Sequence, residues 1–292
     1  MDWSFYAQLL LNGLVMGVIY ALVAMGLSLI FGVLEIVNFA HGEFYMLASM
    51  LAYFLTAQWG FDYWTTILVV TVVGVAVGYV LFEGLRLALR GEAFERSILL
   101  TMGLSMVLQN GAVFLFTTNS HLLESKLSYQ NVVLGDDFRM PVARLYALGL
   151  GFAAFAVLYL ILHRTRIGKA MRGVAQNRAA ADMVGIDARA VSRLAVAIGI
   201  GLTGLAGAAL APVYAVHPLM GFSFVFKAFA IIIIGGLGNI SGAAIAAVML
   251  GIIESFAGGL LPLALTDAVA FISMIAVLLL RPQGLFGRGV RV

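Results

Sequence analysis

The chain has 292 residues, of which 63% are hydrophobic and 11% are charged, and its mean hydropathy is +1.06. A soluble domain is about 45–50% apolar and about 25% charged, so this chain has too few polar side chains to cover a water-facing surface. The composition therefore places the chain in a lipid bilayer and excludes a secreted disulfide scaffold, a cytosolic enzyme and a disordered regulator. The absence of cysteine also excludes thiol catalysis and thiolate metal sites. The net charge of +3 does not indicate binding to nucleic acid, because the charges lie between apolar runs.

Uncharged runs long enough to cross a bilayer, about 20 residues each, follow one another along the chain. They lie between these pairs of charged residues: Asp2 and Glu35, Glu43 and Asp62, Asp62 and Glu83, Arg96 and Glu124, Arg144 and Arg164, Arg193 and Lys227, and Lys227 and Glu254. A last run, Leu260 to Leu280, is interrupted by Asp267. A membrane β-barrel would instead show alternating strands of about ten residues. We predict an all-α polytopic transmembrane bundle with about eight membrane segments, some of them broken or re-entrant.

We expect one transmembrane domain over residues 1–292, because no Pro/Ser-rich linker or low-complexity tract divides the chain. Lys and Arg concentrate in cytoplasmic loops, and here they gather at residues 86–96, 164–193 and 281–291. These three segments, including the carboxyl-terminal tail, are predicted to face the cytoplasm, and residues 119–143 to form an outer loop. The first apolar run lacks a basic n-region and exceeds the length of a signal-peptide core, so we expect it to remain as a helix.

A polar break follows the first long apolar run and contains Asn38, His41, Gly42 and Glu43. In one interpretation Asn38 caps the next helix at a membrane boundary and Glu43 lies in its first turn, near exposed N–H groups. In the other, these four residues line the substrate path or act as a hinge. No second His, Asp or Glu lies at ligand spacing around His41, so no metal site is expected.

The second break contains Gly235, Gly236, Gly238 and Asn239. Three glycines within four residues would strongly destabilise an uninterrupted helix, so the chain is predicted to turn or unwind there. The apolar run before it, residues 224–234, spans only about half a bilayer, which favours a half-helix. These residues are the second group of path or hinge candidates. The sequence has no P-loop motif, so we expect no ATP hydrolysis and no cofactor in this chain.

Single charges within apolar stretches are costly in lipid and need partners, water or an interfacial position. We interpret Glu35 and Lys227 as side chains that extend to a membrane interface, and Glu254 as a residue at the outer boundary. No proton-relay chain, Ser-His-Asp set or His-Glu-x-x-His motif is present. Their absence argues against a proton-coupled carrier and against an intramembrane protease.

The basic segment 164–193 has the pattern of a short amphipathic helix that ends near Gly185. Its apolar residues recur at helical spacings: Ala170, Met171, Val174, Ala181 and Val184. Such a helix either rests on anionic lipid headgroups or fits into a groove on a cytoplasmic motor protein. The pattern alone leaves both interpretations open.

Four blocks of the sequence carry a family resemblance, and they follow one another in the family's order. They are residues 26–32 with 38–42; residues 168–172 with Ala175, Gln176, Asn177, Ala181, Gly185 and Ile186; residues 227–229, 235–239 and 242–243 with Glu254; and residues 281–287. In these blocks the chain resembles the permease subunits of branched-chain amino-acid ABC importers. The resemblance implies that an ATPase-coupling loop contains Gly168, Lys169, Ala170, Met171, Arg172, Asn177 and Gly185.

The resemblance also implies a transport subunit of the bacterial inner membrane that is not itself an enzyme. Its expected partners are a second homologous permease subunit, an extracytoplasmic substrate-binding protein and two cytoplasmic ATPase subunits that bind ATP-Mg. The family commonly has small residues where this chain has residues 231–234, which leaves import of urea or short amides as an alternative. An ion-coupled secondary carrier, a channel and a membrane-embedded enzyme are further alternatives from other classes.

Overall fold

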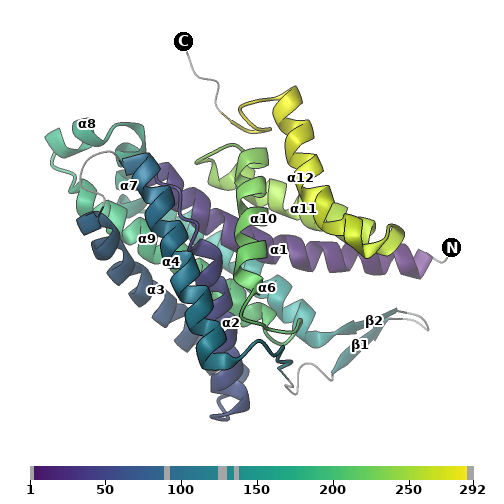
Figure 1. Ribbon diagram of the computed structural model, residues 1–292. Coiled ribbons are helices and arrows are strands. Elements are labelled where there is room, and N and C mark those ends of the chain that lie inside the picture. Colours follow the sequence, from purple (N-terminus) through teal and green to yellow (C-terminus); the bar gives the residue numbers. More distant parts are fainter. Residues whose placement is uncertain (1–2, 89–92, 124–129, 135–137, 288–292) are drawn as a thin grey trace.

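The computed structural model describes residues 3–88, 93–123, 130–134 and 138–287. Its helices are α1 (Trp3–Leu34), α2 (His41–Ala57), α3 (Tyr63–Ala88), α4 (Ala93–Phe116), α6 (Val142–Arg164), α7 (Arg166–Gln176), α8 (Arg178–Met183), α9 (Ala188–Leu210), α10 (Met220–Gly235), α11 (Ile240–Leu260) and α12 (Leu263–Leu280). Strands β1 (Asn131–Leu134) and β2 (Phe138–Pro141) form an antiparallel hairpin in which Asn131 pairs with Pro141. The predicted all-α membrane bundle is confirmed (Figure 1).

Six helices of the described chain are long and apolar enough to cross a bilayer: α1, α3, α4, α6, α9 and α11. Helix α10, with 16 residues, is shorter, and α2 has 17. Charged residues flank two of these helices: Glu35 directly follows α1, and Asp62 directly precedes α3. At these two points, the charge that ends an apolar run also marks the end of a helix, as expected from the cost of placing a charge in lipid.

Helix α1 is the centre of the bundle, and most of its apolar window is buried. It packs along α11 and α9, while α6 covers another of its sides. Glycines allow the close approach to α11: a Cβ on Gly17 would lie 2.7 Å from Cα of Val248, and one on Gly13 would lie 2.6 Å from Cα of Ile252. Small residues at such crossings let helix backbones come together in a membrane, where apolar side chains gain little by leaving lipid.

Helix α6 joins the two ends of the molecule, since it follows the β hairpin and is itself followed by α7 (Figure 1). The hairpin lies within the predicted outer loop, and α7 and α8 lie within the predicted cytoplasmic segment 164–193. The two segments therefore lie at opposite ends of one apolar helix of 23 residues, about 35 Å at 1.5 Å per residue. That length is sufficient to cross a bilayer.

Candidate functional site

The first break returns the chain into the interior of the bundle. Asn38 is buried, and its Oδ1 accepts a hydrogen bond from the backbone N–H of Ala40 at 3.1 Å. The N-cap residue of α2 is Ala40, which provides no side-chain cap. The interpretation that Asn38 caps this helix is therefore wrong: its side chain turns the chain two residues earlier, as short Asn side chains do in turns. His41 and Glu43 follow inside the helix and are fully buried.

A row of hydroxyl groups on α4 holds the extended backbone that leads into this break. Thr101 Oγ1 accepts a hydrogen bond from Phe39 N–H at 3.1 Å and lies 3.1 Å from the carbonyl oxygen of Val37. Ser97 Oγ accepts from Val37 N–H at 3.4 Å. Buried backbone groups outside regular structure need such partners. These hydroxyls were not among the predicted site residues, although their spacing of four along an apolar helix places them on one face.

Glu43 receives one hydrogen bond from the same row, because Ser105 Oγ donates to its Oε1 at 3.0 Å. Its Oε2 is buried, accepts no hydrogen bond from the part of the chain that the structure describes, and faces Gly221, where a Cβ would collide with it. A Cβ on Gly42 would in turn collide with the carbonyl oxygen of Gly221. The amino-terminal ends of α2 and α10 thus meet inside the bundle with the carboxyl group of Glu43 between them. Helix amino termini carry partial positive charge, which favours an acidic group at this position.

The side chain of His41 has a defined tautomer. Its Nε2 lies 3.1 Å from the carbonyl oxygen of Val23 and 2.8 Å from Thr203 Oγ1. A carbonyl can only accept, so Nε2 carries the proton; the Thr203 hydroxyl donates to the carbonyl of Gly199 at 2.9 Å. Nδ1 remains a buried acceptor without a hydrogen bond. Among the described residues no group of three or more His, Cys, Asp or Glu side chains could hold a metal ion.

The second break is a turn between α10 and α11, as predicted. Helix α10 ends at Gly235, and Gly236 and Gly238 have φ angles of +95° and +76°, which other residues adopt at a cost. Asn239 caps α11, since its Oδ1 accepts a hydrogen bond from Gly242 N–H at 3.0 Å. Helix α10 begins at Met220, four residues before the predicted run, and is about 24 Å long.

The segment after α12 folds back onto this turn. Leu285 N–H donates to the carbonyl oxygen of Ile234 at 2.7 Å, and Asn239 Nδ2 donates to that of Phe286 at 2.8 Å. Space is so limited that a Cβ on Gly236 would lie 2.7 Å from the backbone nitrogen of Gly287. The terminal block of the sequence is therefore part of the second break.

The segment 164–193 forms two short helices rather than the single one predicted to end near Gly185. Helix α7 ends at Gln176, because Asn177 leaves the helical conformation and caps α8 by accepting from Ala180 N–H at 2.9 Å. Gly185, with φ +82°, then turns the chain toward α9. The predicted apolar residues Met171, Val174 and Ala181 are buried. Val184 is 76% exposed instead, because it lies beyond the end of α8.

Helix α7 is attached closely to the end of α6. Thr165 caps α7 by accepting from Gly168 N–H at 3.1 Å. Gly168 has no room for a side chain, since a Cβ there would collide with the carbonyl oxygens of Ile161 and Leu162. Arg172 also donates to the Leu162 carbonyl. These contacts fix the angle between the two helices.

A cavity of about 490 Å³ brings residues of the second break together with the predicted coupling loop. Gly238 and Asn239 line it from the turn, and Met171 and Arg172 line it from α7. The end of α1 and the last turns of α6 complete its wall. Residues of the first break do not line it.

Lys227 and Glu254 form an ion pair inside the bundle, with Nζ 3.1 Å from Oε1. Tyr20 donates its hydroxyl proton to the other oxygen of Glu254 at 2.7 Å. Lys227 therefore does not extend to solvent as predicted, because it is largely buried and paired with a carboxylate on the neighbouring helix. The position of Glu254 at the outer boundary stays a prediction. Glu35 is exposed, in agreement with an interfacial position.

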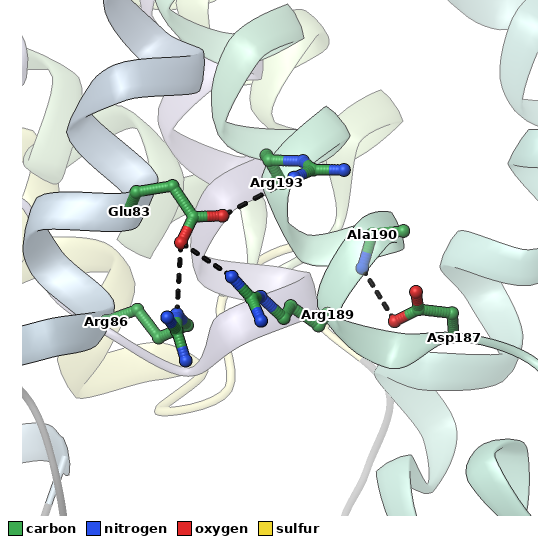
Figure 2. Close-up of polar contacts among 6 residues, drawn as sticks. All are labelled: Glu83, Arg86, Asp187, Arg189, Ala190 and Arg193. Carbon is green, nitrogen blue, oxygen red and sulfur yellow. Dashed lines mark hydrogen bonds and ion pairs between the residues drawn. The ribbon is translucent and has the colours of Figure 1, made fainter.

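Near the ends of α3 and α9, one carboxylate holds three guanidinium groups (Figure 2). Glu83 lies 3.1 Å from Arg86, 2.9 Å from Arg189 and 3.4 Å from Arg193. Arg193 also lies over the ring of Tyr79, 4.5 Å from its centroid. The cluster fixes α3 to α9 through Arg189 and Arg193, the last basic residues of the segment 164–193, and retains a net charge of about +2.

Comparison with known proteins identifies relatives along nearly the whole chain. The family model described as branched-chain amino acid transport system / permease component matches residues 9–278. The chain is 33% identical to the high-affinity branched-chain amino acid transport system permease protein BraD of Pseudomonas aeruginosa, over 97% of this chain and 96% of that protein. It is 30% identical to the permease protein LivH of Escherichia coli K12, over 98% and 97%. No solved structure matches the chain. The chain therefore belongs to the family of branched-chain amino acid transport permeases.

Proposed function

We propose that this chain is the permease subunit of an ABC importer that moves branched-chain amino acids into the cytoplasm. In this proposal a second homologous permease subunit completes the path, an extracytoplasmic binding protein delivers the substrate, and two cytoplasmic ATPases bind ATP-Mg. The chain lies in the bacterial inner membrane with residues 164–193 and 281–291 on the cytoplasmic side.

The observation that carries the proposal is the cavity shared by α7 and the second break. Gly238 and Asn239 lie on one wall and Met171 and Arg172 on another. In this mechanism a displacement of α7 changes the shape of the cavity that the turn between α10 and α11 also lines. Residues Gly168, Lys169, Ala170, Met171, Arg172, Asn177 and Gly185 belong to the segment that would receive this displacement from an ATPase.

The exposed surface of the same segment fits a protein partner. Ile167, Met183 and Val184 are 46%, 81% and 76% exposed at the end of the molecule that carries the basic residues. Exposed apolar side chains rimmed by charged ones are typical of interaction sites. ATP binding would favour one conformation of the permease only if the ATPases contact this surface differently in the two conformations.

The two breaks have complementary parts in this mechanism. The first places the buried groups of His41 and Glu43 where α2 and α10 meet, an arrangement of broken helices that transporters use to line a substrate path. The second, with its positive φ angles at Gly236 and Gly238, is the hinge candidate. Rotation about a few such residues would alternate access between the two sides.

The test is co-purification of the tagged chain with its candidate partners, followed by ATP-dependent uptake of labelled leucine and urea into proteoliposomes. We expect leucine uptake that requires the ATPases and the binding protein and that is lost when residues 168–172 are scrambled. If the complex takes up urea and not leucine, the proposed subunit architecture stands and the proposed substrate is wrong. Transport by the isolated chain, driven by an ion gradient, would overturn the proposal.

A second variant tests the hinge. Replacing Gly236 and Gly238 by Leu is expected to abolish uptake while membrane insertion persists, because both residues have positive φ and Gly236 touches the terminal segment. Normal uptake by this variant would contradict the assignment of the second break.

A further inference from the structure

A second cavity, of about 300 Å³, lies in the opposite half of the bundle from the cavity beside α7. Leu9, Asn12 and Met16 line it from the first turns of α1, and Glu254 and Ser255 line it from α11. Its volume is at the lower end of the range of small-molecule sites, about 300–1,000 Å³. It lies in the predicted outer half, on the side from which an imported substrate would arrive.

Glu254, which lines this cavity, belongs to a buried ion pair whose other member, Lys227 on α10, does not itself line the cavity. Glu254 is only 7% exposed and is paired with Lys227 at 3.1 Å and with the Tyr20 hydroxyl at 2.7 Å. Lys227 Nζ also lies 3.3 Å from the Tyr20 oxygen. A buried ion pair is a poor source of stability, since desolvation of both charges offsets their attraction. Charges retained inside a membrane helix bundle beside a cavity therefore indicate a role in ligand binding.

The pair matches the two charges that every α-amino acid carries. A carboxylate such as Glu254 binds an ammonium group, and an ammonium group such as Lys227 binds a carboxylate. The cavity next to them also offers apolar side chains, Leu9 and Met16, for an aliphatic side chain. A neutral solute such as urea would leave both charges buried and unpaired if it separated them, which is costly.

We propose that the cavity is a substrate subsite at which the ammonium and carboxylate groups of a transported amino acid replace the ion pair between Lys227 and Glu254. Without substrate the two side chains neutralise each other, and Tyr20 holds the carboxylate in place. With substrate, Glu254 binds the ammonium group and Lys227 binds the carboxylate. The subsite thereby selects zwitterions over neutral amides. This inference rests on the proposed import of amino acids.

A neutral double variant separates this role from a purely structural one. Lys227→Met or Glu254→Gln alone leaves one buried charge without its partner, so each single variant is expected to unfold at a lower temperature. The double variant removes both charges and is expected to recover the unfolding temperature, since neutral replacements of a buried pair are commonly tolerated. If the pair only holds α10 against α11, the double variant will also transport normally.

The experiment uses the complete complex in proteoliposomes with its binding protein and labelled leucine. We expect the double variant to assemble and to hydrolyse ATP. Its leucine uptake is expected to fall by more than about tenfold, because a tenfold loss corresponds to one substrate contact of about 1.4 kcal/mol. If the wild-type complex imports leucine and the double variant imports it equally fast, the subsite is overturned and the proposed function is unaffected. Failure of the wild-type complex to import amino acids would instead overturn the proposed function.

A second variant keeps the inference testable if the double variant does not assemble. Gly258 lines the same cavity, and among the described side chains a Cβ there would meet only Thr266, at 3.6 Å, so Gly258→Leu is expected to fill the space without a backbone collision. Gly149→Leu on α6 is the matched control, because no atom of the described residues lies within 4 Å of a Cβ at Gly149. Loss of leucine uptake in Gly258→Leu alone supports the subsite, and normal uptake in both variants refutes it.

Discussion

Gly26 on α1 and Gly199 on α9 lie so close together that neither has room for a side chain. A Cβ on Gly26 would lie 2.5 Å from the carbonyl oxygen of Gly199, and a Cβ on Gly199 would lie 2.8 Å from that of Gly26. The contact is mutual and involves backbone atoms, so no side-chain rotation can relieve an added methyl group. The two helices can cross at this distance only because both residues are glycine.

Gly26→Ala is therefore expected to destabilise the bundle by about 1–3 kcal/mol, the usual cost of overpacking, although Ala is the better helix former. Gly103→Ala on α4 is the control, since none of the residues that the structure describes comes within 4 Å of a Cβ there. Unfolding of the purified variants in mixed detergent micelles measures the difference. Equal unfolding midpoints for the two variants would contradict the crossing described for α1 and α9.

The hydroxyl group of Thr101 provides a second prediction. Thr101→Val removes the acceptor of Phe39 N–H and leaves this partly buried backbone group without its partner, which costs about 1–3 kcal/mol. Thr101→Ser retains the hydroxyl group, so its free energy of unfolding should decrease much less. The same unfolding assay compares the two variants. If they are equally stable, the α4 hydroxyl row does not support the first break.

The ends of the long helices could be predicted from the sequence, whereas the interior of the first break could not. Charges are excluded from lipid, so Glu35 and Asp62 mark helix ends whatever the remainder of the fold does. The path of residues 35–40 depends instead on hydroxyls about sixty residues away, at Ser97 and Thr101. Their spacing of four was a usable signal for a polar helix face, but it does not identify the segment that faces them.

The same limit applies to Lys227 and Glu254. Each is recognisable in the sequence as a costly charge within an apolar run, but the sequence alone favours an interfacial position for Lys227 and a boundary position for Glu254. Their contact depends on the packing of α10 against α11, and Tyr20 joins it from α1. Helix packing of this kind is a tertiary property that charge positions alone do not determine.

The division of the segment 164–193 at Asn177 has a local cause that sequence reasoning missed. The apolar spacing continues past this residue, but an Asn side chain competes with the helix by accepting from Ala180 N–H. Asn is a favoured N-cap, so its presence between two stretches of helix-forming residues was a signal for a new start. Of the apolar residues at helical spacings, Met171, Val174 and Ala181 are buried in the two helices.

The carboxylate of Glu83 is expected to matter more than any one of its three guanidinium partners. Glu83→Gln leaves three positive groups close together at the junction of α3 and α9, and it is expected to lower the unfolding midpoint. Arg86→Gln, which removes one exposed partner, should cost about 1 kcal/mol or less. Unfolding of the two variants at low and high salt tests this prediction. The difference between their unfolding midpoints should become smaller at high salt, because salt screens the repulsion among the three guanidinium groups.

The exposed apolar residues beyond α7 provide a test of assembly. Replacing Met183 and Val184 by Ser is expected to weaken co-purification of the ATPase subunits with little change in the unfolding midpoint, since both side chains are largely exposed in this chain. Trp59→Ser is the control, because Trp59 is another exposed side chain and lies just after the carboxyl end of α2. Unchanged recovery of the ATPases with the Met183 and Val184 variant would show that they bind elsewhere.

The return of residues 281–287 onto the turn after α10 has a consequence for the order in which the fold is completed. The hydrogen bonds from Leu285 to Ile234 and from Asn239 to Phe286 require a segment that is translated only after α12. During synthesis, every described membrane helix can enter the bilayer while the second break still lacks these partners. The hinge candidate is therefore assembled in a step after insertion, and a chain that stops short of Gly284 would be inserted yet retain an incomplete turn.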